Sequence, residues 1–115
     1  MSRTPQEVFA AHVGALASAD LPALLRDYTD DAVLLAPDGP RRGREEIEQF
    51  FAAALQALPH ATFHARATVF DADALLLVWS ADSASARITD AVDTFVFADD
   101  QIRLQTTAFT LQTTS

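Results

Sequence analysis

The stretch GREEIEQFFAAALQALP, residues 43–59, separates a helical first half of the chain from a second half built of strand patterns. Its apolar residues recur at spacings of three and four, which is the period of one helix face. They are Ile47, Phe50, Phe51, Ala54, Leu55 and Leu58. Glu45 and Glu46 lie in the first turn, where the helix dipole favours acidic side chains. We therefore expect a helix from about Gly43 to Leu58, ended by Pro59.

Two further helices are expected before this stretch. Thr4 and Glu7 have the spacing of a capping box, with Pro5 at the first helical position. The apolar stripe of this first helix is Val8, Phe9, His12, Val13 and Leu16. Asp20 is placed to cap a shorter second helix, whose inward stripe would be Leu21, Leu24, Leu25 and Tyr28. A short strand over residues 32–36 follows, ended by the turn residues 37–40.

After Pro59 the chain contains only strand patterns. We place strands at about residues 60–70, 74–81, 87–97 and 101–112, separated by polar breaks. Consecutive strands with short turns predict an antiparallel meander. Helices followed by strands indicate an α+β fold, with the helices on one face of a curved sheet and residues 1–115 in one domain.

Composition excludes several classes of function. The chain has no cysteine, which removes disulfides, thiolate nucleophiles and cysteine zinc sites. A formal net charge of −8 disfavours nucleic acid and anionic membranes as partners. No apolar run approaches the ~20 residues that span a bilayer, and the N-terminus lacks the apolar core of a signal peptide. We expect a cytoplasmic protein.

The strand Leu75-Leu76-Leu77-Val78-Trp79 is apolar on both faces. An antiparallel sheet with helices on one face should have a polar outer face, so something must cover this strand. The chain has no further helix to do so. We predict a homodimer packed through the sheets, with Trp79 as an anchor.

Asp93 is the strongest candidate for a functional residue. It lies inside the strand Ala91-Val92-Asp93-Thr94-Phe95-Val96-Phe97, neither face of which looks solvated. An ionised carboxylate in apolar surroundings is costly, and such groups are neutralised, paired or hydrogen-bonded. Two interpretations remain. Asp93 either faces a cavity as a functional acid, or is a structural residue bonded to the backbone, Tyr28, Thr107 or His12.

His12 lies in the apolar stripe of the first helix. It is either a core histidine with satisfied ring nitrogens or a neutral imidazole that faces a cavity and moves a proton. If His12 and Asp93 meet, the pair could share a proton. His60 and His64 have the spacing of helical zinc ligands, but on a strand four residues span roughly 13 Å, so a solvated polar face is favoured. We predict no metal site.

Other polar groups have simpler interpretations. Asp30-Asp31 and Asp99-Asp100 are read as turn formers. The cluster Arg41, Arg42 and Arg44 could bind an anion, but a solvated loop is favoured. No glycine motif for phosphate binding and no nucleophile elbow is present.

The stretch from Tyr28-Thr29-Asp30-Asp31-Ala32-Val33 to Gly43-Arg44-Glu45-Glu46-Ile47 resembles the ketosteroid isomerase and SnoaL-like polyketide cyclase group of the nuclear transport factor 2 superfamily. The resemblance covers nearly the whole chain. It implies a cone-shaped fold with an apolar pocket between helices and sheet, and dimerisation through the sheet.

In the isomerases, a tyrosine on the first helix and a late aspartic acid stabilise a dienolate oxygen; these positions correspond to His12 and Asp93. The position of the isomerase base corresponds to Ala36, which cannot take a proton. In the SnoaL-like cyclases a single late acidic residue transfers the proton. The resemblance also implies a pocket lined by Tyr28, Phe50, Leu76, Val78 and Phe109.

We therefore hypothesise a dimeric protein that binds an apolar, oxygen-bearing small molecule and transfers a proton on it, without a cofactor. Asp93 would polarise or protonate a substrate oxygen, and His12 would bond to Asp93 or move the proton. The alternative is a non-catalytic binding or dimerisation module whose pocket is filled by Phe63, Phe95, Phe97 and Phe109. A cavity of ~300 Å³ or more that reaches Asp93 would favour the first hypothesis.

Overall fold

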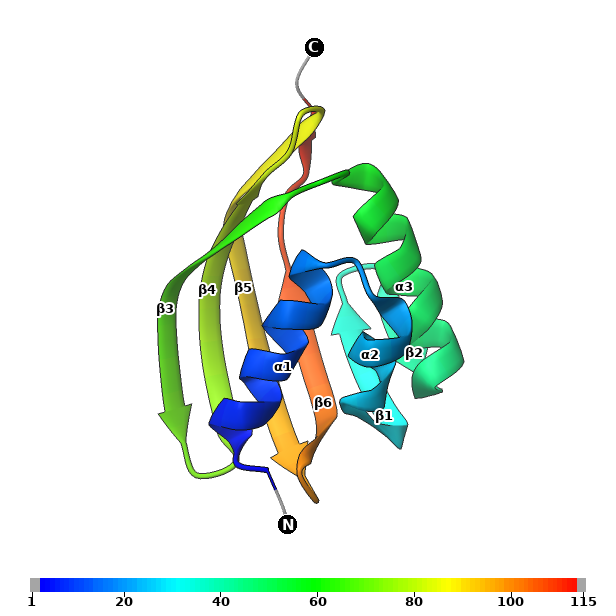
Figure 1. The fold of residues 1–115 in the computed structure, drawn as a ribbon, viewed down its shortest axis with the longest axis vertical. Helices are drawn as coiled ribbons and strands as arrows, with labels where there is room; N and C mark the ends of the chain where they lie inside the picture. Colours follow the sequence, from blue (N-terminus) through cyan, green and yellow to red (C-terminus); the bar gives the residue numbers. More distant parts are fainter. Residues whose placement is uncertain (1–2, 114–115) are drawn as a thin grey trace.

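Three helices lie against one face of a curved sheet in the computed structural model, which describes residues 3–113 (Figure 1). The helices are α1 (Pro5–Ala17), α2 (Leu21–Arg26) and α3 (Gly43–Ala57). The strands are β1 (Tyr28–Ala36), β2 (Gly39–Arg42), β3 (Thr62–Asp71), β4 (Ala74–Asp82), β5 (Ala86–Ala98), β6 (Gln101–Ala108) and β7 (Gln112–Thr113). The predicted α+β class is confirmed.

Local sequence determines where the helices begin. The Thr4 hydroxyl accepts a hydrogen bond from the Glu7 amide at 3.1 Å, and the Glu7 carboxylate accepts one from the Thr4 amide at 2.8 Å. The capping box is thus complete, as expected. Asp20 caps α2 by accepting from the Ala23 amide.

None of the helices within residues 3–113 is long and apolar enough to cross a membrane.

The sheet has the order β2-β1-β6-β5-β4-β3, with β7 paired to β5. The four strands β3 to β6 form the predicted antiparallel meander. The expected antiparallel sheet departs from this pattern at one junction, because β1 runs parallel to β6. The hairpin of β1 and β2 therefore extends the meander through a parallel junction. The last predicted strand is also too long, since β6 ends at Ala108 and β7 pairs separately with β5.

The segment between α2 and α3 differs most from the predicted elements. Helix α2 ends at Arg26, so Tyr28 begins β1 instead of completing a helical stripe. Asp30 and Asp31 lie within β1, in an irregular part where the register to β6 shifts between Tyr28 and Val33. They are therefore not turn residues. Asp99 and Asp100 do form the β5–β6 turn, and both have the positive φ that aspartate tolerates.

The arginine cluster is also not a solvated loop. Arg41 and Arg42 belong to strand β2, and Arg44 lies in the first turn of α3. Arg41 pairs with Asp38 at 3.0 Å and lies over the Phe50 ring. Arg44 pairs with Asp30 at 2.7 Å, so two of the three arginines already have an acidic partner.

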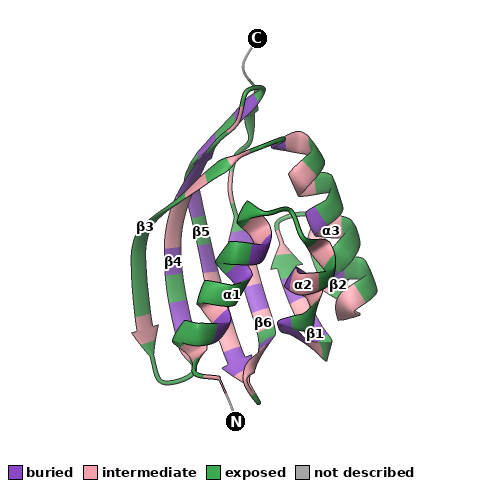
Figure 2. Cartoon of the chain, viewed as in Figure 1, coloured by how far each residue is buried: buried purple, intermediate pink, exposed green. Residues whose placement is uncertain are grey.

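The hydrophobic core lies between the helices and the inner face of the sheet, so buried and exposed residues alternate along β4 and β5 (Figure 2). Buried core residues from all layers include Val8, Leu24, Leu34, Ile47, Leu75, Phe95 and Ile102. The two faces of the sheet are thereby distinguished: the inner face carries the core, and the outer face is where Val69, Leu76 and Val92 remain exposed.

Candidate functional site

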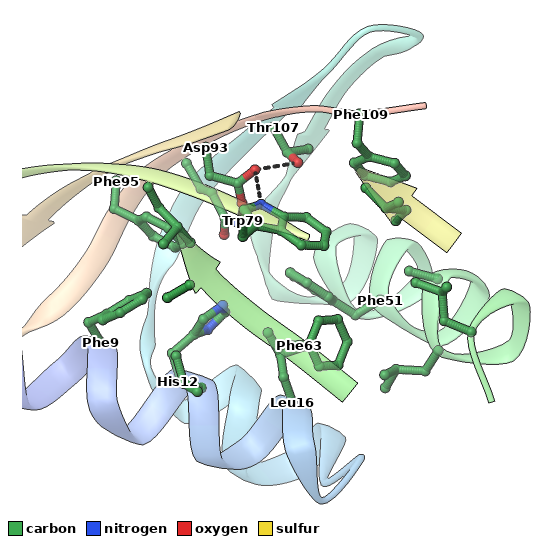
Figure 3. A pocket seen from close by; sticks show the side chains of 18 of the residues that line it. Phe9, His12, Leu16, Phe51, Phe63, Trp79, Asp93, Phe95, Thr107 and Phe109 are labelled. Atoms are coloured by element: carbon green, nitrogen blue, oxygen red, sulfur yellow. Dashed lines mark hydrogen bonds between the residues drawn. The ribbon is translucent and has the colours of Figure 1, made fainter. Parts of the chain in front are cut away.

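An aromatic cavity lies between α1, α3 and the inner face of β3 to β6, and it reaches Asp93 (Figure 3). Its volume is about 100 Å³. Among the described residues its lining is mostly apolar, with polar groups from His12, His64, Trp79, Asp93, Gln105 and Thr107. The cavity is smaller than the ~300 Å³ that favours a ligand of drug size, yet the phenylalanines do not fill it.

Asp93 lies on the inner face of the central strand β5, opposite Leu77 of β4 and Thr107 of β6. Its residue exposure is 5 %. Trp79 Nε1 donates a hydrogen bond to Oδ1 at 3.0 Å, and the Thr107 hydroxyl donates to the same oxygen at 2.7 Å. Gln105 Nε2 donates to Oδ2 at 2.9 Å. The carboxyl group is thus buried, cavity-facing and an acceptor of three bonds.

Burial raises the pKa of Asp93 above its ordinary value, because desolvation disfavours the charged form. The hydrogen bonds from Trp79, Thr107 and Gln105 act against this rise in pKa, because they stabilise the carboxylate. A carboxyl group with a pKa moved upward towards neutrality is suited to exchange protons with a bound molecule.

Behind Gln105 lies a second buried residue, Tyr28, whose hydroxyl donates to Gln105 Oε1. Tyr28 has no exposed surface and Gln105 has 2 %. Burial and the nearby Asp93 carboxylate keep the pKa of the Tyr28 hydroxyl well above its ordinary value. The tyrosine is therefore a neutral donor, and the glutamine amide connects it to Asp93 by hydrogen bonds.

His12 faces the cavity from α1, on the side opposite the sheet (Figure 3). Its ring makes edge contacts with Tyr28, Phe51 and Phe95 at centroid distances of 5.4–6.0 Å. Burial lowers its pKa to about 4, so the imidazole is neutral at pH 7. Within residues 3–113, its buried Nδ1 has no hydrogen-bond partner. The proposed bond to Asp93 is absent, since the donors to Asp93 are the three residues named above.

Trp79 lies on the inner face and not on the outer one, so its predicted role as an outer-face dimer anchor is wrong. Its ring lies between Phe63 and Phe109, with centroid distances of 6.0 and 5.8 Å, and its N–H is directed to Asp93. It therefore both walls the cavity and positions the carboxyl group.

Leu76 and Val78 were expected to line the cavity, but the structure places them on the outer face of the sheet. They pair with Thr94 and Val92 across the β4–β5 ladder, on the face away from the helices, and they are absent from the cavity lining. The strand is apolar on both faces, so sequence alone did not distinguish them from Leu77 and Trp79, and a slip of one residue exchanges the faces.

Of the other residues predicted to line the cavity, some do line it and others lie outside it. Phe50 and Phe109 line the cavity as expected. Tyr28 was expected to line the cavity but is not among the lining residues, because its ring is buried behind Gln105. Ala36 lies in the β1–β2 hairpin opposite Gly39, outside the lining residues, so this position supplies no base.

The two histidines lie on different elements of the structure. His60 lies in the turn before β3, with a positive φ of 53°, and not in the strand as predicted. His64 is half exposed and its Nε2 lies 3.4 Å from an Asp82 oxygen. Residues 3–113 hold no cluster of three metal-ligating side chains.

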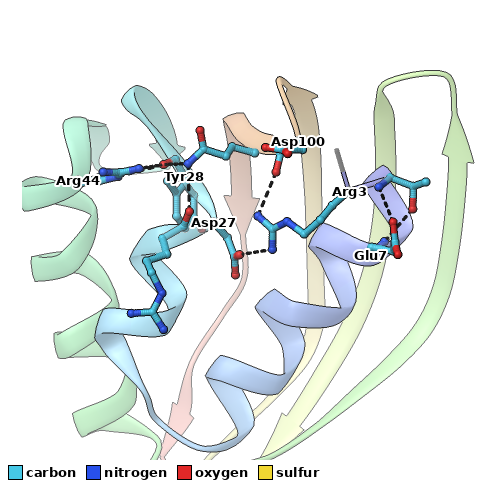
Figure 4. A network of polar contacts seen from close by, with 9 residues as sticks. Arg3, Glu7, Asp27, Tyr28, Arg44 and Asp100 are labelled. Carbon is cyan, nitrogen blue, oxygen red and sulfur yellow. Dashed lines mark hydrogen bonds and ion pairs between the residues drawn. The ribbon is translucent and has the colours of Figure 1, made fainter. Parts of the chain in front are cut away.

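A separate polar network lies at the end of the fold where α1 begins and β5 turns into β6 (Figure 4). The Arg3 guanidinium donates to the buried Asp27 carboxylate at 2.9 Å and to the Asp100 carbonyl oxygen at 3.0 Å. Arg44 donates to the Tyr28 carbonyl oxygen and pairs with Asp30 at 2.7 Å. These bonds hold the start of β1 between α1, α3 and the β5–β6 turn, which places Tyr28 behind Gln105.

Gln105 was missed by sequence reasoning. Its neighbours Arg103, Leu104, Thr106 and Thr107 form no alternating pattern, so nothing marked one face as inner. The available signal was that a buried acid requires donors from neighbouring strands. The same requirement for donors predicts Thr107, which is one of the expected partners of Asp93.

Helices packed on one face of a curved, open sheet, around an apolar cavity with one buried acid, define the cone-shaped class of α+β pocket proteins. The SnoaL-like domain matches residues 9–105, and the chain belongs to this family. A search of curated proteins found no match.

Solved structures share the fold at low identity. An NTF2-like protein of unknown function from Cytophaga hutchinsonii has a TM-score of 0.79 at 14 % identity, over 96 % of this chain and 93 % of that one. IdmH from Streptomyces antibioticus, described as a candidate polyketide cyclase, has a TM-score of 0.78 at 18 % identity, over 93 % and 92 %. A SnoaL-like protein of unknown function from Burkholderia thailandensis has 0.77 at 21 %, over 92 % and 94 %.

Proposed function

We propose that this SnoaL-like protein binds a small, largely apolar carbonyl compound in its aromatic cavity and transfers a proton on it through Asp93. The single observation that carries the proposal is a buried carboxyl group, tied to three donors, at the wall of an open hollow. A residue needed only for packing would not require a polar support of this kind, because an apolar residue would fill the same place at lower cost.

The chemistry follows from the atoms available. A C–H bond next to the substrate carbonyl breaks, an O–H bond forms on Asp93, and the electron pair moves into the carbonyl to give an enolate. The proton then returns to carbon or oxygen of the same molecule. No redox partner is needed. Isomerisation with a second base at position 36 is not supported, because that residue is an alanine in the β1–β2 hairpin.

His12 is proposed as a neutral contact for the ligand. Its unpartnered Nδ1 lies in a ring that faces the cavity, and a pKa of about 4 keeps it uncharged at pH 7. It therefore does not supply a proton as an imidazolium ion near neutrality. Its contribution is a polar contact or the shape of the cavity floor.

The test combines binding and proton exchange. Cyclic ketones and 1,3-dicarbonyl compounds would be screened by thermal shift and by the loss of their α-proton NMR signals in deuterium oxide. We expect wild type to accelerate exchange and Asp93→Asn to abolish the acceleration. Asp99→Asn is the matched control, since it removes the same charge from the exposed β5–β6 turn. Equal exchange in wild type and Asp93→Asn would overturn the proposal.

A second candidate function is a non-catalytic module, and the cavity volume of about 100 Å³ favours it. In that case Asp93 organises the core and no bound molecule is transformed. A ligand screen that leaves the thermal transition unchanged for every compound, together with unchanged α-proton exchange, would support this candidate over the enzyme.

We further propose a homodimer formed through the outer face of the sheet, acting in the cytoplasm. Val69, Leu76 and Val92 are 57, 43 and 42 % exposed, and the pairing places Val69 beside Leu76 and Val92 beside Val78 on that face. Analytical ultracentrifugation should give a dimer for wild type and a monomer for Leu76→Asp. The control Leu111→Asp changes an exposed leucine that lies between β6 and β7, and should remain dimeric. A monomeric wild type would contradict the proposal.

A further inference from the structure

The hydrogen bonds around Asp93 have a direction that is set by chemistry. The Trp79 indole N–H donates and has no acceptor atom, so the Asp93 oxygen at 3.0 Å must accept. The Gln105 amide offers a donor at one end and an acceptor at the other, so its direction depends on what it meets at both ends. One end meets Asp93 and the other meets Tyr28.

Two arrangements of the chain Tyr28–Gln105–Asp93 satisfy the glutamine. In the arrangement present, the Tyr28 hydroxyl donates to Gln105 Oε1, and Gln105 Nε2 donates to Asp93 Oδ2, which suits an ionised carboxylate. In the reverse arrangement a protonated Asp93 donates to a flipped Gln105, whose N–H groups then turn to the Tyr28 oxygen. The Tyr28 O–H would have to find a new acceptor in a site without solvent access.

The reverse arrangement is therefore disfavoured by Tyr28, a residue that does not touch Asp93. Gln105 Oε1 is the acceptor the structure gives to the Tyr28 hydroxyl within the described residues, and a buried hydroxyl without an acceptor is costly. Tyr28 thus favours the orientation in which the Gln105 N–H points to Asp93, and this N–H favours the ionised form of the Asp93 carboxyl group. Desolvation of Asp93 acts in the other direction, so the balance of the two effects determines the charge of the site.

We propose that Tyr28 and Gln105 are positioning residues that hold Asp93 as a hydrogen-bond acceptor. The cavity then selects neutral ligands that present a donor to this carboxylate, either a hydroxyl or an acidic C–H group. The ligand class rests on the proposed function, whereas the role of Tyr28 and Gln105 does not. The inference reverses the expectation that Asp93 donates to a substrate oxygen. It also excludes anions, because none of the 20 lining residues is lysine or arginine.

The first experiment measures the charge of Asp93 directly, by a pH titration of its side-chain ¹³C NMR signal. In wild type we expect the pKa of Asp93 to lie above its ordinary value, with the group present as a carboxylate at pH 7. In Tyr28→Phe the bias on Gln105 is removed, and we expect the pKa of Asp93 to rise by about one pH unit. Gln105→Met removes the donor itself, keeps the volume, and should raise the pKa by a similar amount.

The matched control for this titration is Ile102→Val. Ile102 is fully buried and is the strand partner of Tyr28, but it lies outside the hydrogen-bond chain and the cavity lining. Its truncation loosens the same region without removing a polar group, so the pKa of Asp93 should stay within about 0.3 pH units of wild type. An unchanged pKa in both Tyr28→Phe and Gln105→Met would overturn the positioning role, as would an Asp93 that is mostly protonated in wild type at pH 7.

The second experiment tests the ligand class with phenol and anisole, which have similar shapes and differ in the hydroxyl donor. Binding would be followed at pH 7, where phenol is neutral, by NMR shifts of the Trp79 indole N–H. We expect phenol to bind wild type about tenfold more tightly than anisole, and the ratio to shrink in Tyr28→Phe.

The outcomes separate the two proposals. If anisole binds as tightly as phenol, the ligand class is wrong while a cavity for small apolar molecules remains. If neither compound binds, the proposed function and the ligand class both fail. The carboxyl titration still decides the role of Tyr28 and Gln105 in that case, because it needs no ligand.

Discussion

The replacement His12→Phe removes a titratable ring from the centre of the aromatic cluster and keeps a ring of similar size. His12 is 2 % exposed and its Nδ1 has no partner within residues 3–113. The pKa of His12 falls from 6.5 to about 4 because burial disfavours the charged imidazolium. Lowering the pH should therefore destabilise the fold through the protonation of His12.

The magnitude follows from the two pKa values. The difference between 6.5 and about 4 is roughly 2.5 pH units, and one unit corresponds to about 1.4 kcal/mol, so the linkage is worth about 3–4 kcal/mol. Between these values the unfolded chain binds more protons than the folded one, so stability falls as the pH decreases. Wild type should keep this contribution above pH 6.5 and lose it progressively as the pH falls through about 4.

The assay is urea unfolding followed by the fluorescence of Trp79, at pH values from 7 to 4.5. We expect wild type to lose about 2–3 kcal/mol more than His12→Phe over this range. His60→Asn is the control, because His60 is exposed in the turn before β3 and its removal should leave the acid dependence unchanged. Equal losses in wild type and His12→Phe would show that the ring is hydrated or paired, and would refute the reasoning.

Three further predictions concern the acids and the core. Because burial raises the pKa of Asp93, its contribution to stability should be largest at low pH and decline as the pH rises through the pKa of the folded state. In urea titrations, Asp93→Asn should therefore gain stability relative to wild type as the pH rises from 4 to 7. Arg3→Ala leaves the Asp27 carboxylate, 5 % exposed, without its cation and should cost about 1–2 kcal/mol; a change below about 0.5 kcal/mol would contradict this. Leu75→Ala, at a core position 1 % exposed, should cost about 2–5 kcal/mol, whereas the exposed Leu111→Ala should cost less than about 1.

Helices and meander were predictable because they depend on local signals. The capping box at Thr4 and Glu7 and the regular period of residues 43–58 act over a few residues, and both appear in the structure. The candidate acid was also predictable, because a carboxylate in a strand without a polar face must be supported by donors. The donors themselves came from β4 and β6, which lie next to β5 only after folding.

The register of the β5–β6 hairpin shows why those donors could not be assigned from sequence. Counting from the turn pair Ala98 and Gln101 without interruption would place Thr106 opposite Asp93. The ladder shifts between Val96 and Phe97, so Thr107 lies there instead. This one-residue shift also brings Gln105 to the inner face, where it contacts Asp93 and Tyr28.

The amino-acid sequence by itself determined the α+β class, the helix starts and the identity of the buried acid, because periodicity, capping and the cost of burying charge are local properties. Only the tertiary structure decided which face of β4 meets the cavity, that Trp79, Gln105 and Thr107 hold Asp93, and that His12 Nδ1 has no partner within residues 3–113. Those outcomes depend on strand register and on ladder irregularities. A shift of one residue moves a side chain to the opposite face of the sheet, and an apolar strand such as β4 carries no pattern that reveals the shift.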